Sequence, residues 1–589
     1  MIAILTDKPN VGKEIARILG AHTREDGYMS ENGYMATWTF GNMLSLAMPK
    51  DYGMDRPERG DFPINPAPFR LMVKHIRTDT GWIPDINAVL QLKVIEKVFD
   101  ACESIIAATD ASREGEMVFR YLYRYLECRK PYRRLWISSL TDEAVLEGMG
   151  SLRPGSLYDR MFLAADSRNK ADWILGINAS YAMCKATGLG NNSLGRVQTP
   201  VLAAISRRYR ERENHISSDS WPIYISLQKD GILFKMRRTQ DLPDKESATM
   251  FFQDCKLAHQ AQITGISHSV KEILPPDLLD LTQLQKEANI RYGFTASEVY
   301  DIAQSLYEKK LISYPRTSSR YLTEDVFDSL PPIMACLLSW ELFPAAKGTG
   351  GIDISNLSRH VISAEKANVH HAIIITGIRP GNLSEKEMQV YRLVAGRMLE
   401  TFMAPCRIET TNVEAVCAAQ HFKAEQTRII EAGWHDVFMR YDMIPTSGYS
   451  VKELPEVEKG DTLNVCGCNM VHKKELPVDP FTDAELVEYM ELNGLGTVSS
   501  RTNIIRTLVN RKYIRYSGKY IVPTPKGMFT YETIRGKKIA DTSLTADWEK
   551  QLAGLESGMI TGQDFLNRIR TLAKEMTDDI FNTYSTKEE

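Results

Sequence analysis

The sequence predicts a multidomain protein of mixed class, with an α/β domain at the N-terminus followed by separate helical and β-rich domains. Two short apolar runs each lead through an acidic loop into a helical pattern, which is typical of a parallel α/β sheet. Two strand-rich stretches, 221–270 and 405–475, flank a helical segment from 280 to 400. The chain has 589 residues, which is enough for about four domains of roughly 150 residues each.

The two α/β units lie at residues 1–20 and 104–126, with the runs "MIAIL" and "SIIAA" as their strands. Ligand sites in parallel sheets lie at the carboxyl ends of strands, so we expect Asp7 and Asp110 to lie at one edge of the sheet. Between the units, residues 31–80 contain the run "MPKDYGMDRPERGDFPINPAPF". This composition predicts a loop insertion.

The loop "TDASREGE" offers hard oxygen ligands, among them Asp110 and Glu114. Mg²⁺ typically takes one or two carboxylates and keeps water or substrate phosphates for the rest. The alternative is a helix start whose acids lie near the positive end of the helix dipole, but Asp7 at a second strand end favours the metal. The segment "PNVGKE" is no phosphate loop, because that pattern needs glycine at position 7 and serine or threonine at position 14.

The net charge of −3 gives no overall sign of a nucleic-acid partner. Residues 501–526, however, carry seven Lys or Arg side chains and no acid, with Tyr513, Tyr516 and Tyr520 interleaved. Positive charge combined with aromatic rings is how proteins hold single strands, by phosphate neutralisation and base stacking. The alternative is a solvated charged surface.

The N-terminal apolar run is five residues long, too short for a signal peptide, and no later run approaches the roughly 20 apolar residues of a membrane span. The nine cysteines are scattered, as in proteins of a reducing compartment. We therefore expect a cytoplasmic protein without membrane contact, and the cysteine spacing predicts no structural zinc.

The stretch "LISYPRTSSRYL", residues 311–322, follows a well-marked helix. Thr295 and Glu298 have the spacing of a capping box, and apolar residues recur from 299 to 306 on one helix face. Pro315 favours an extended conformation of Tyr314. The tyrosine is therefore predicted to sit on a short, stiff connection to a packed helix.

Tyr314 is either a buried aromatic residue or a nucleophile. Transesterification of a phosphodiester needs an oxygen nucleophile, a cation on the phosphate and an acid for the leaving oxygen. Tyr314 supplies the first and Arg316 the second. His370 or His371 is a candidate further donor to the phosphate, with a buried core histidine as the alternative.

Eight stretches together resemble one family, the type IA DNA topoisomerases, and among them the topoisomerase III branch. They occur in the family's order across nearly the whole chain: "DKPNVGKEIARIL", "TDASREGE", "SRNKADWILGIN", "SLGRVQTPVL", "LTQLQKEANIRYGFTASEVYDIAQSLYEKKLISYPRTSSRYL", "HHAIIIT", "PFTDAELVEYMELNGLGTVSSRTNIIRTLVNRKYI" and "LTADWEKQL".

The resemblance implies a toroidal protein of four domains. The expected ranges are 1–150 for a Toprim α/β domain, 151–218 and 476–589 for a helical single-strand DNA-binding domain, 219–278 and 405–475 for a β-rich gate domain, and 279–404 for a helical domain carrying the tyrosine.

The resemblance also implies roles for particular residues. Tyr314 would form a 5′-phosphotyrosine with help from Arg316, Lys8 would contact the scissile phosphate, Asp7 would act in catalysis, and His370 would support it. Mg²⁺ would bind at Asp7, Asp110 and Glu114. The residues expected to bind DNA are Arg168, Ser193, Leu194, Gly195, Arg196, Val197, Gln198, Thr199 and Arg501.

Two positions depart from the family pattern. Asp7 replaces a glutamate, and Ser112 replaces the middle residue of an acidic triad, which predicts weak Mg²⁺ binding. The expected activity is ATP-independent and Mg²⁺-dependent: one DNA strand is cut, another is passed through, and the cut strand is rejoined, which relaxes negative supercoils, decatenates DNA, or does both.

Two alternatives remain open, a Toprim nuclease or primase and a catalytically impaired single-strand DNA-binding protein. We expect a monomer of bacterial type that acts on single-stranded segments of nucleoid or plasmid DNA. A helicase or a single-strand-binding protein is the class of protein partner that fits this activity.

Overall fold

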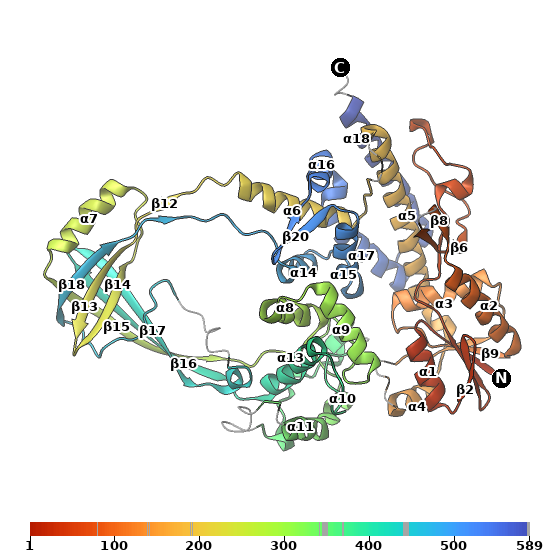
Figure 1. Cartoon of the computed structure of the whole chain (residues 1–589), viewed down its shortest axis with the longest axis horizontal. Coiled ribbons are helices and arrows are strands. Elements are labelled where there is room, and N and C mark those ends of the chain that lie inside the picture. Colours follow the sequence, from red (N-terminus) through yellow and green to blue (C-terminus); the bar gives the residue numbers. More distant parts are fainter. Residues whose placement is uncertain are drawn as a thin grey trace.

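The computed structural model describes residues 1–585, except 79–80, 138–139, 141, 189, 191, 341, 344–351, 368–369 and 440–446. These gaps and residues 586–589 fall within the predicted loop and domain ranges, so parts of those predictions lie outside the described residues. Figure 1 shows the described elements arranged as a ring, with a closed β-barrel at one end of the molecule and the N-terminal sheet at the other.

Seven strands form the N-terminal sheet, in the order β11 (Arg153–Pro154), β10 (Tyr132–Arg134), β9 (Ser104–Ala107), β1 (Ile2–Thr6), β4 (Tyr34–Trp38), β3 (Tyr28–Glu31) and β2 (Thr23–Glu25). The central strand β1 pairs in parallel with β9 and β4. Its Ile4 packs with α1 (Pro9–Ile18) on one face, and its Ala3 and Leu5 pack with α2 (Ile86–Ala101) on the other. This burial on both faces is typical of an inner parallel strand.

The range 31–80 differs from the predicted loop insertion in its first part. Tyr34–Trp38 forms β4, which continues from β3 through a hairpin and joins the sheet beside β1. The strand residues "YMATW" precede the proline-rich run, and their buried side chains make them part of the core. Short elements follow, namely β5 (Leu44–Leu46), β6 (Leu71–Val73) and β7 (His75–Thr78), with 3₁₀ turns between β5 and β6.

Two separated chain pieces form the helical part beside this sheet. The first contributes α5 (Asp159–Thr187) and α6 (Gln198–Glu213). The second contributes α14 (Asp483–Leu492), α15 (Val498–Asn510), the hairpin β20 (Ile514–Ser517) and β21 (Tyr520–Pro523), α16 (Pro525–Ile534), α17 (Ser543–Ser557) and α18 (Gly562–Ser585). Ile174 of α5 shares a buried core with Trp548 of α17 and Phe565 of α18, so the two pieces pack as one unit.

Six strands from two further chain pieces close into a barrel, in the order β13 (Ile223–Lys229), β14 (Ile232–Arg238), β17 (Gln420–Glu431), β16 (Cys406–Cys417), β15 (Gln260–Ile273) and β18 (Thr462–Met470). Closure leaves no unpaired strand edge. The chain between β15 and β16 leaves the barrel and forms the helical segment that carries Tyr314.

That segment contains α8 (Leu281–Tyr292), α9 (Ala296–Glu308), α10 (Glu324–Asp328), α11 (Leu330–Ser339) and α13 (Glu385–Phe402). The predicted capping box of α9 is confirmed, since Thr295 accepts from the backbone N–H of Glu298 and Glu298 accepts from that of Thr295. After α9, the backbone N–H of Ser313 donates to the carbonyl of Ile374 at 2.8 Å. This bond fixes the chain one residue before Tyr314.

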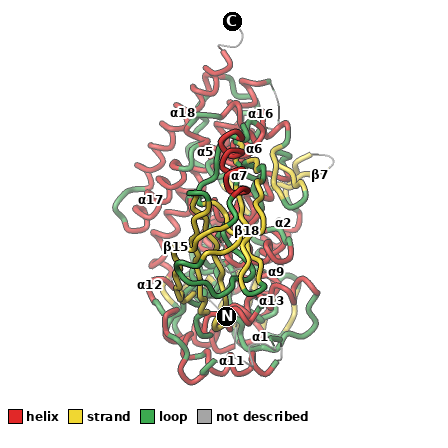
Figure 2. Tube along the Cα trace, turned by 90° about the vertical axis from the view of Figure 1, so that its left-hand side faces the viewer, coloured by secondary structure: helices red, strands yellow, loops and turns green. Residues whose placement is uncertain are grey.

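Seen from the barrel side, β15 and β18 lie in front of the helices (Figure 2). Among the helices in the described ranges, none combines the length and apolar character that crossing a membrane requires.

Candidate active site at the tyrosine pocket

A pocket of about 540 Å³, here called the tyrosine pocket, lies where the N-terminal sheet, the tyrosine segment and α15 meet. It is lined by Asp7, Gly41, Asn42, Asp110, Ser112, Glu114, Gly115, Val118, Tyr300, Tyr314, Arg316, Thr317, Ser318, His370, Thr497, Val498, Ser500 and Asn503. Segments far apart in the sequence therefore bring most of the predicted catalytic residues to one cavity.

The sheet topology places the two aspartates. Asp7 follows β1 and Asp110 follows β9, and because these strands are parallel neighbours their carboxyl ends lie side by side. The loop after β9 turns sharply into α3 (Arg113–Tyr125), where Ser112 accepts from the backbone N–H of Gly115. A Cβ at Gly115 would lie 2.0 Å from the carbonyl oxygen of Asp110, so only glycine allows this turn.

Asp110 is the centre of the polar contacts in the tyrosine pocket. Lys8 Nζ lies 3.2 and 3.3 Å from its two carboxylate oxygens, and Arg316 Nη1 lies 3.3 Å from Oδ2. The hydroxyl of Tyr314 donates to the same Oδ2 at 2.9 Å. One carboxylate thus holds the candidate nucleophile and both candidate phosphate-binding cations.

The two aspartates differ in charge state. Burial and the charge of Asp110 raise the pKa of Asp7 to about 6. Burial also acts to raise the pKa of Asp110, but Lys8 and Arg316 outweigh it and hold that pKa below its ordinary value. Burial and Asp110 raise the pKa of Tyr314 well above its ordinary value. At neutral pH, Asp110 is therefore ionised and the Tyr314 hydroxyl is protonated, while a fraction of Asp7 carries a proton.

His370 connects the tyrosine segment to the N-terminal loop. Its ring centroid lies 4.5 Å from that of Tyr314, and its Nε2–H donates to the carbonyl of Ala111 at 3.1 Å. Burial lowers the pKa of His370 to about 4, so the ring is neutral at pH 7. Its single N–H is already donated to Ala111, so the expected further bond to phosphate would require His370 to leave that partner. His371 instead contacts the carbonyl of Ala372.

The predicted metal ligands face the same pocket but do not form a closed cage. Glu114 receives a hydrogen bond from Arg168 at 3.1 Å, and Asp110 faces Lys8 and Arg316. The Oδ1 atom of Asp7 is buried and has no hydrogen-bond partner in the described part of the chain. Within the described ranges, no group of three or more His, Cys, Asp or Glu residues is arranged to hold a metal ion. This donor set fits a Mg²⁺ ion that uses one or two carboxylates together with water and phosphate.

Comparison with known proteins identifies the family. The family described as DNA topoisomerase matches residues 156–567, and the Toprim domain family matches residues 2–140. The chain belongs to the type IA DNA topoisomerases.

Curated relatives of this topoisomerase include DNA topoisomerase 3 of Bacillus licheniformis, which is 32% identical over 604 residues, with 98% of this chain and 81% of the relative covered. DNA topoisomerase 3 of Bacillus subtilis is 32% identical over 622 residues, with coverages of 99% and 82%. Among solved structures, full-length topoisomerase I from Thermotoga maritima superposes with a TM-score of 0.73 at 21% identity, covering 98% of this chain and 90% of that one. The toroidal fold class is thereby confirmed.

The predicted DNA-binding residues of the topoisomerase fall into two groups. In the first, Gln198 donates to Ser193 Oγ at 3.0 Å, and Arg511 donates to Gln198 at 2.7 Å and also to Ser193. The backbone N–H of Gly195 donates to Thr199 at 2.9 Å, which closes the turn before α6. Leu194 and Val197 of this turn are buried.

The second group holds elements of the topoisomerase together. The Arg196 side chain is 1% exposed and pairs with Asp172 at 2.9 Å and with Glu549 at 3.4 Å. Arg501 is 9% exposed and donates to Thr282 and Glu491 at 3.0 and 3.2 Å. A direct contact between either arginine and DNA would require it to leave these partners.

Three residues of the site were missing from the predicted set. Arg511 was recognised only as part of the basic segment, which was the available signal. Tyr300 and Gln304 lie one turn apart on α9, where the Tyr300 ring faces Arg316 at 5.1 Å and Gln304 accepts from Arg316 at 3.2 Å. Tyr300 and Gln304 are four residues apart in the helix that precedes Tyr314, and this spacing predicts that they share a helix face.

Proposed function

We propose that Tyr314 is the nucleophile of this topoisomerase and that Lys8 and Arg316 stabilise the scissile phosphate. The observation that carries this proposal is the meeting of all three side chains on the Asp110 carboxylate. The anionic carboxylate of Asp110 contacts the nucleophile and both cations. A scissile phosphate, which is also an anion, would have to contact the same three side chains.

The reaction exchanges one phosphoester for another. Tyr314 Oη attacks the phosphorus, the bond to the 3′ oxygen breaks, and a 5′-phosphotyrosine forms. Asp110 Oδ2 is the acceptor already hydrogen-bonded to the Tyr314 hydroxyl, and Asp7 donates the proton that the leaving 3′ oxygen needs. The reverse attack by the 3′ hydroxyl rejoins the strand, so no nucleotide triphosphate is consumed.

Other residues position these groups. His370 packs against the Tyr314 ring and ties it to the backbone of Ala111, while Tyr300 and Gln304 support Arg316. A bound Mg²⁺ would be held by one or two of the carboxylates of Asp7, Asp110 and Glu114, and it would supply positive charge toward the DNA phosphates.

The DNA substrate is a single-stranded segment, which we place along Arg168, residues 193–199 and Arg501. Topoisomerase activity of this kind relaxes negatively supercoiled DNA, decatenates it, or does both. We propose that the protein acts as a monomer on bacterial nucleoid or plasmid DNA, with a helicase or single-strand-binding protein as partner. In this proposal, the domain at 151–218 and 476–589 binds the single strand, the domain at 279–404 carries the tyrosine, the domain at 219–278 and 405–475 forms the gate, and the domain at 1–150 is the Toprim domain.

The test is a covalent adduct on a denaturing gel after incubation with labelled single-stranded DNA. We expect the unaltered protein to form the adduct and Tyr314→Phe to form none, because only the nucleophilic oxygen is removed. Single-strand binding by Tyr314→Phe should stay near the unaltered level, since the ring still packs. An adduct formed by the Phe variant would refute the assignment, and cleavage without any adduct would indicate a nuclease.

A further inference from the structure

A second basic surface crosses helix α6, away from the tyrosine pocket. It is a groove of about 970 Å³, here called the α6 groove, whose lining includes Pro200, Ala203, Ala204, Arg207, Tyr489 and Arg535. Five of its lining side chains are cationic and two are acidic. The groove shares no lining residue with the tyrosine pocket.

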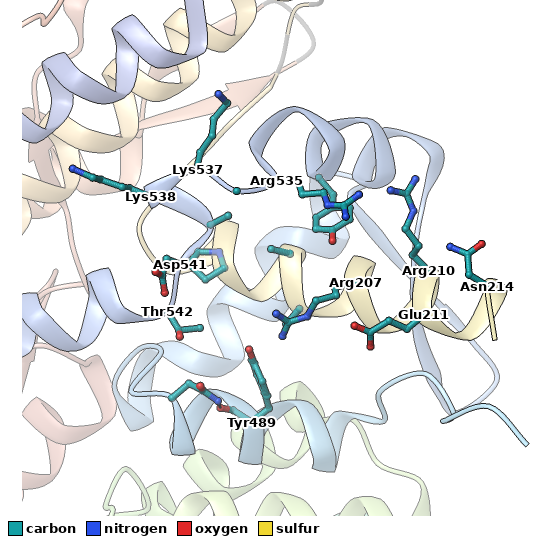
Figure 3. Close-up of a pocket in the computed structure, with 17 residues that line it drawn as sticks. Arg207, Arg210, Glu211, Asn214, Tyr489, Arg535, Lys537, Lys538, Asp541 and Thr542 are labelled. Carbon is teal, nitrogen blue, oxygen red and sulfur yellow. Dashed lines mark hydrogen bonds between the residues drawn. The ribbon is translucent and has the colours of Figure 1, made fainter. Parts of the chain in front are cut away.

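Two of the cations have no partner among the residues that the structure describes. Arg207 and Arg535 are exposed and form no ion pair or side-chain hydrogen bond within the described part of the chain. Arg210, in contrast, pairs with Glu532. Lys537 and Lys538 pair with Asp579 and Glu575 of α18, and Figure 3 shows both lysines turned away from α6.

The free arginines face the groove from both sides of α6. In Figure 3, Arg207 and Tyr489 lie on the α14 side of the helix, and Arg535 lies on the α16 side. Between them the floor is formed by Pro200, Ala203 and Ala204, small residues on one helix face. A chain can therefore lie close to α6 with a guanidinium on each side.

Arg207 is not placed to stabilise the end of its helix. Cations favour the last turn of a helix, but Arg207 lies well before the end of α6 at Glu213. Arg535 caps the end of α16, where a cation is favourable, yet this does not explain why it faces the same groove as Arg207. Unpaired guanidiniums with an aromatic ring suit phosphates and bases of a single strand.

The groove adjoins the proposed DNA path along the chain but lies on another face of α6 than Gln198, so a strand would reach it by crossing the helix. It begins at Pro200, directly after the stretch 193–199 that we assign to single-strand binding. We propose that the α6 groove is a second DNA-binding site, in which Arg207 and Arg535 hold the phosphodiester backbone of single-stranded DNA that extends beyond the tyrosine pocket. This inference rests on the proposed function, and the experiment below separates the two.

The test compares two single-stranded oligonucleotides, one that reaches only residues 193–199 and one long enough to reach Arg535. Each lost phosphate contact reduces the salt slope of single-strand binding by about 0.7, so R207A/R535A should reduce the slope on the long strand by about 1.4. The affinity that the variant loses relative to the unaltered protein should therefore be about 25-fold greater at 0.1 M salt than at 1 M salt. Binding of the short strand and adduct formation on it should not change.

Two matched variants complete the experiment. R207K/R535K retains both charges and should keep most of the affinity for the long strand. R568A/K550A removes two exposed cations of α18 and α17 that also have no ion pair among the described residues, and it should bind both strands like the unaltered protein.

Unchanged binding of the long strand by R207A/R535A would overturn the proposal, and so would an equal loss on both strands or a loss seen only on duplex DNA. Failure of the unaltered protein to form any adduct would instead refute the proposed function. In that case the comparison of long and short strands would still report on the groove.

Discussion

The tyrosine pocket and the α6 groove both contain cationic side chains, but these differ in whether they pair with a carboxylate of the protein. In the tyrosine pocket, Lys8 and Arg316 are paired with Asp110 inside the protein. In the α6 groove, Arg207 and Arg535 have no carboxylate partner within the described ranges. A DNA phosphate must therefore compete with a carboxylate in the first site, whereas in the second it only displaces water and counterions.

This difference suits the tyrosine pocket to strand cleavage and the α6 groove to DNA binding. Side chains that meet on Asp110 are already oriented before DNA arrives, which favours a transition state that needs them in one arrangement. Free cations on a surface bind phosphates irrespective of sequence and respond strongly to salt. The two sites thus suit cleavage at one phosphate and retention of the rest of the strand.

The largest expected effect is that of Asp7→Ala, which impairs catalysis in the tyrosine pocket and leaves the α6 groove unchanged. Removing a positioned acid typically costs about 10²–10⁴ in rate, so Asp7→Ala should slow cleavage and rejoining by that factor. Single-strand binding should survive, because the free cations of the groove are untouched. Single-turnover cleavage and filter binding measure the two quantities.

The matched control is Asp7→Glu, which keeps the carboxyl group and should remain active. Cleavage by Asp7→Ala at the unaltered rate would show that the proton comes from another group, with Lys8 or water as the next candidates.

The second prediction contrasts a paired arginine with a free one. Arg196→Ala removes a buried cation, but its partners Asp172 and Glu549 are partly exposed and can be solvated afterwards, so we expect a cost of about 1.5–3 kcal/mol, as for a lost hydrogen bond to a charged group. Arg207→Ala changes an exposed side chain and should alter the free energy of unfolding by no more than about 0.5 kcal/mol.

Denaturant unfolding followed by tryptophan fluorescence compares these two variants, and Trp548 lies beneath Arg196 at 4.8 Å. Equal stability of the two variants would contradict the structural role assigned to Arg196.

The smallest expected effect tests whether Asp110 competes with DNA phosphates for Lys8 and Arg316. Asp110→Asn preserves the shape and an acceptor for Tyr314 but removes the charge that pairs with Lys8 and Arg316. Two newly available phosphate contacts should steepen the salt slope of single-strand binding by about 1.4. Weaker binding with a shallower slope would mean that Asp110 assists DNA binding instead of competing with it.

Local features of the fold could be predicted from the sequence. The strand–loop–helix units around Asp7 and Asp110 and the capping box at Thr295 and Glu298 depend on interactions between residues close in the chain. The strand β4 was missed because its apolar residues adjoin a long proline-rich run. Composition assigned the whole range 31–80 to a loop, while burial against β1 decided otherwise.

For the site, the sequence could predict only which residue types were available: a tyrosine before a proline, an arginine two residues on, and acids after two strands. The packing of the folded chain shows that Asp110 accepts from Tyr314, 204 positions further along the chain, and that Arg196 is buried while Arg207 is exposed. The reason is physical: pairing and burial depend on which distant segments pack together, and a sequence pattern records only neighbours along the chain.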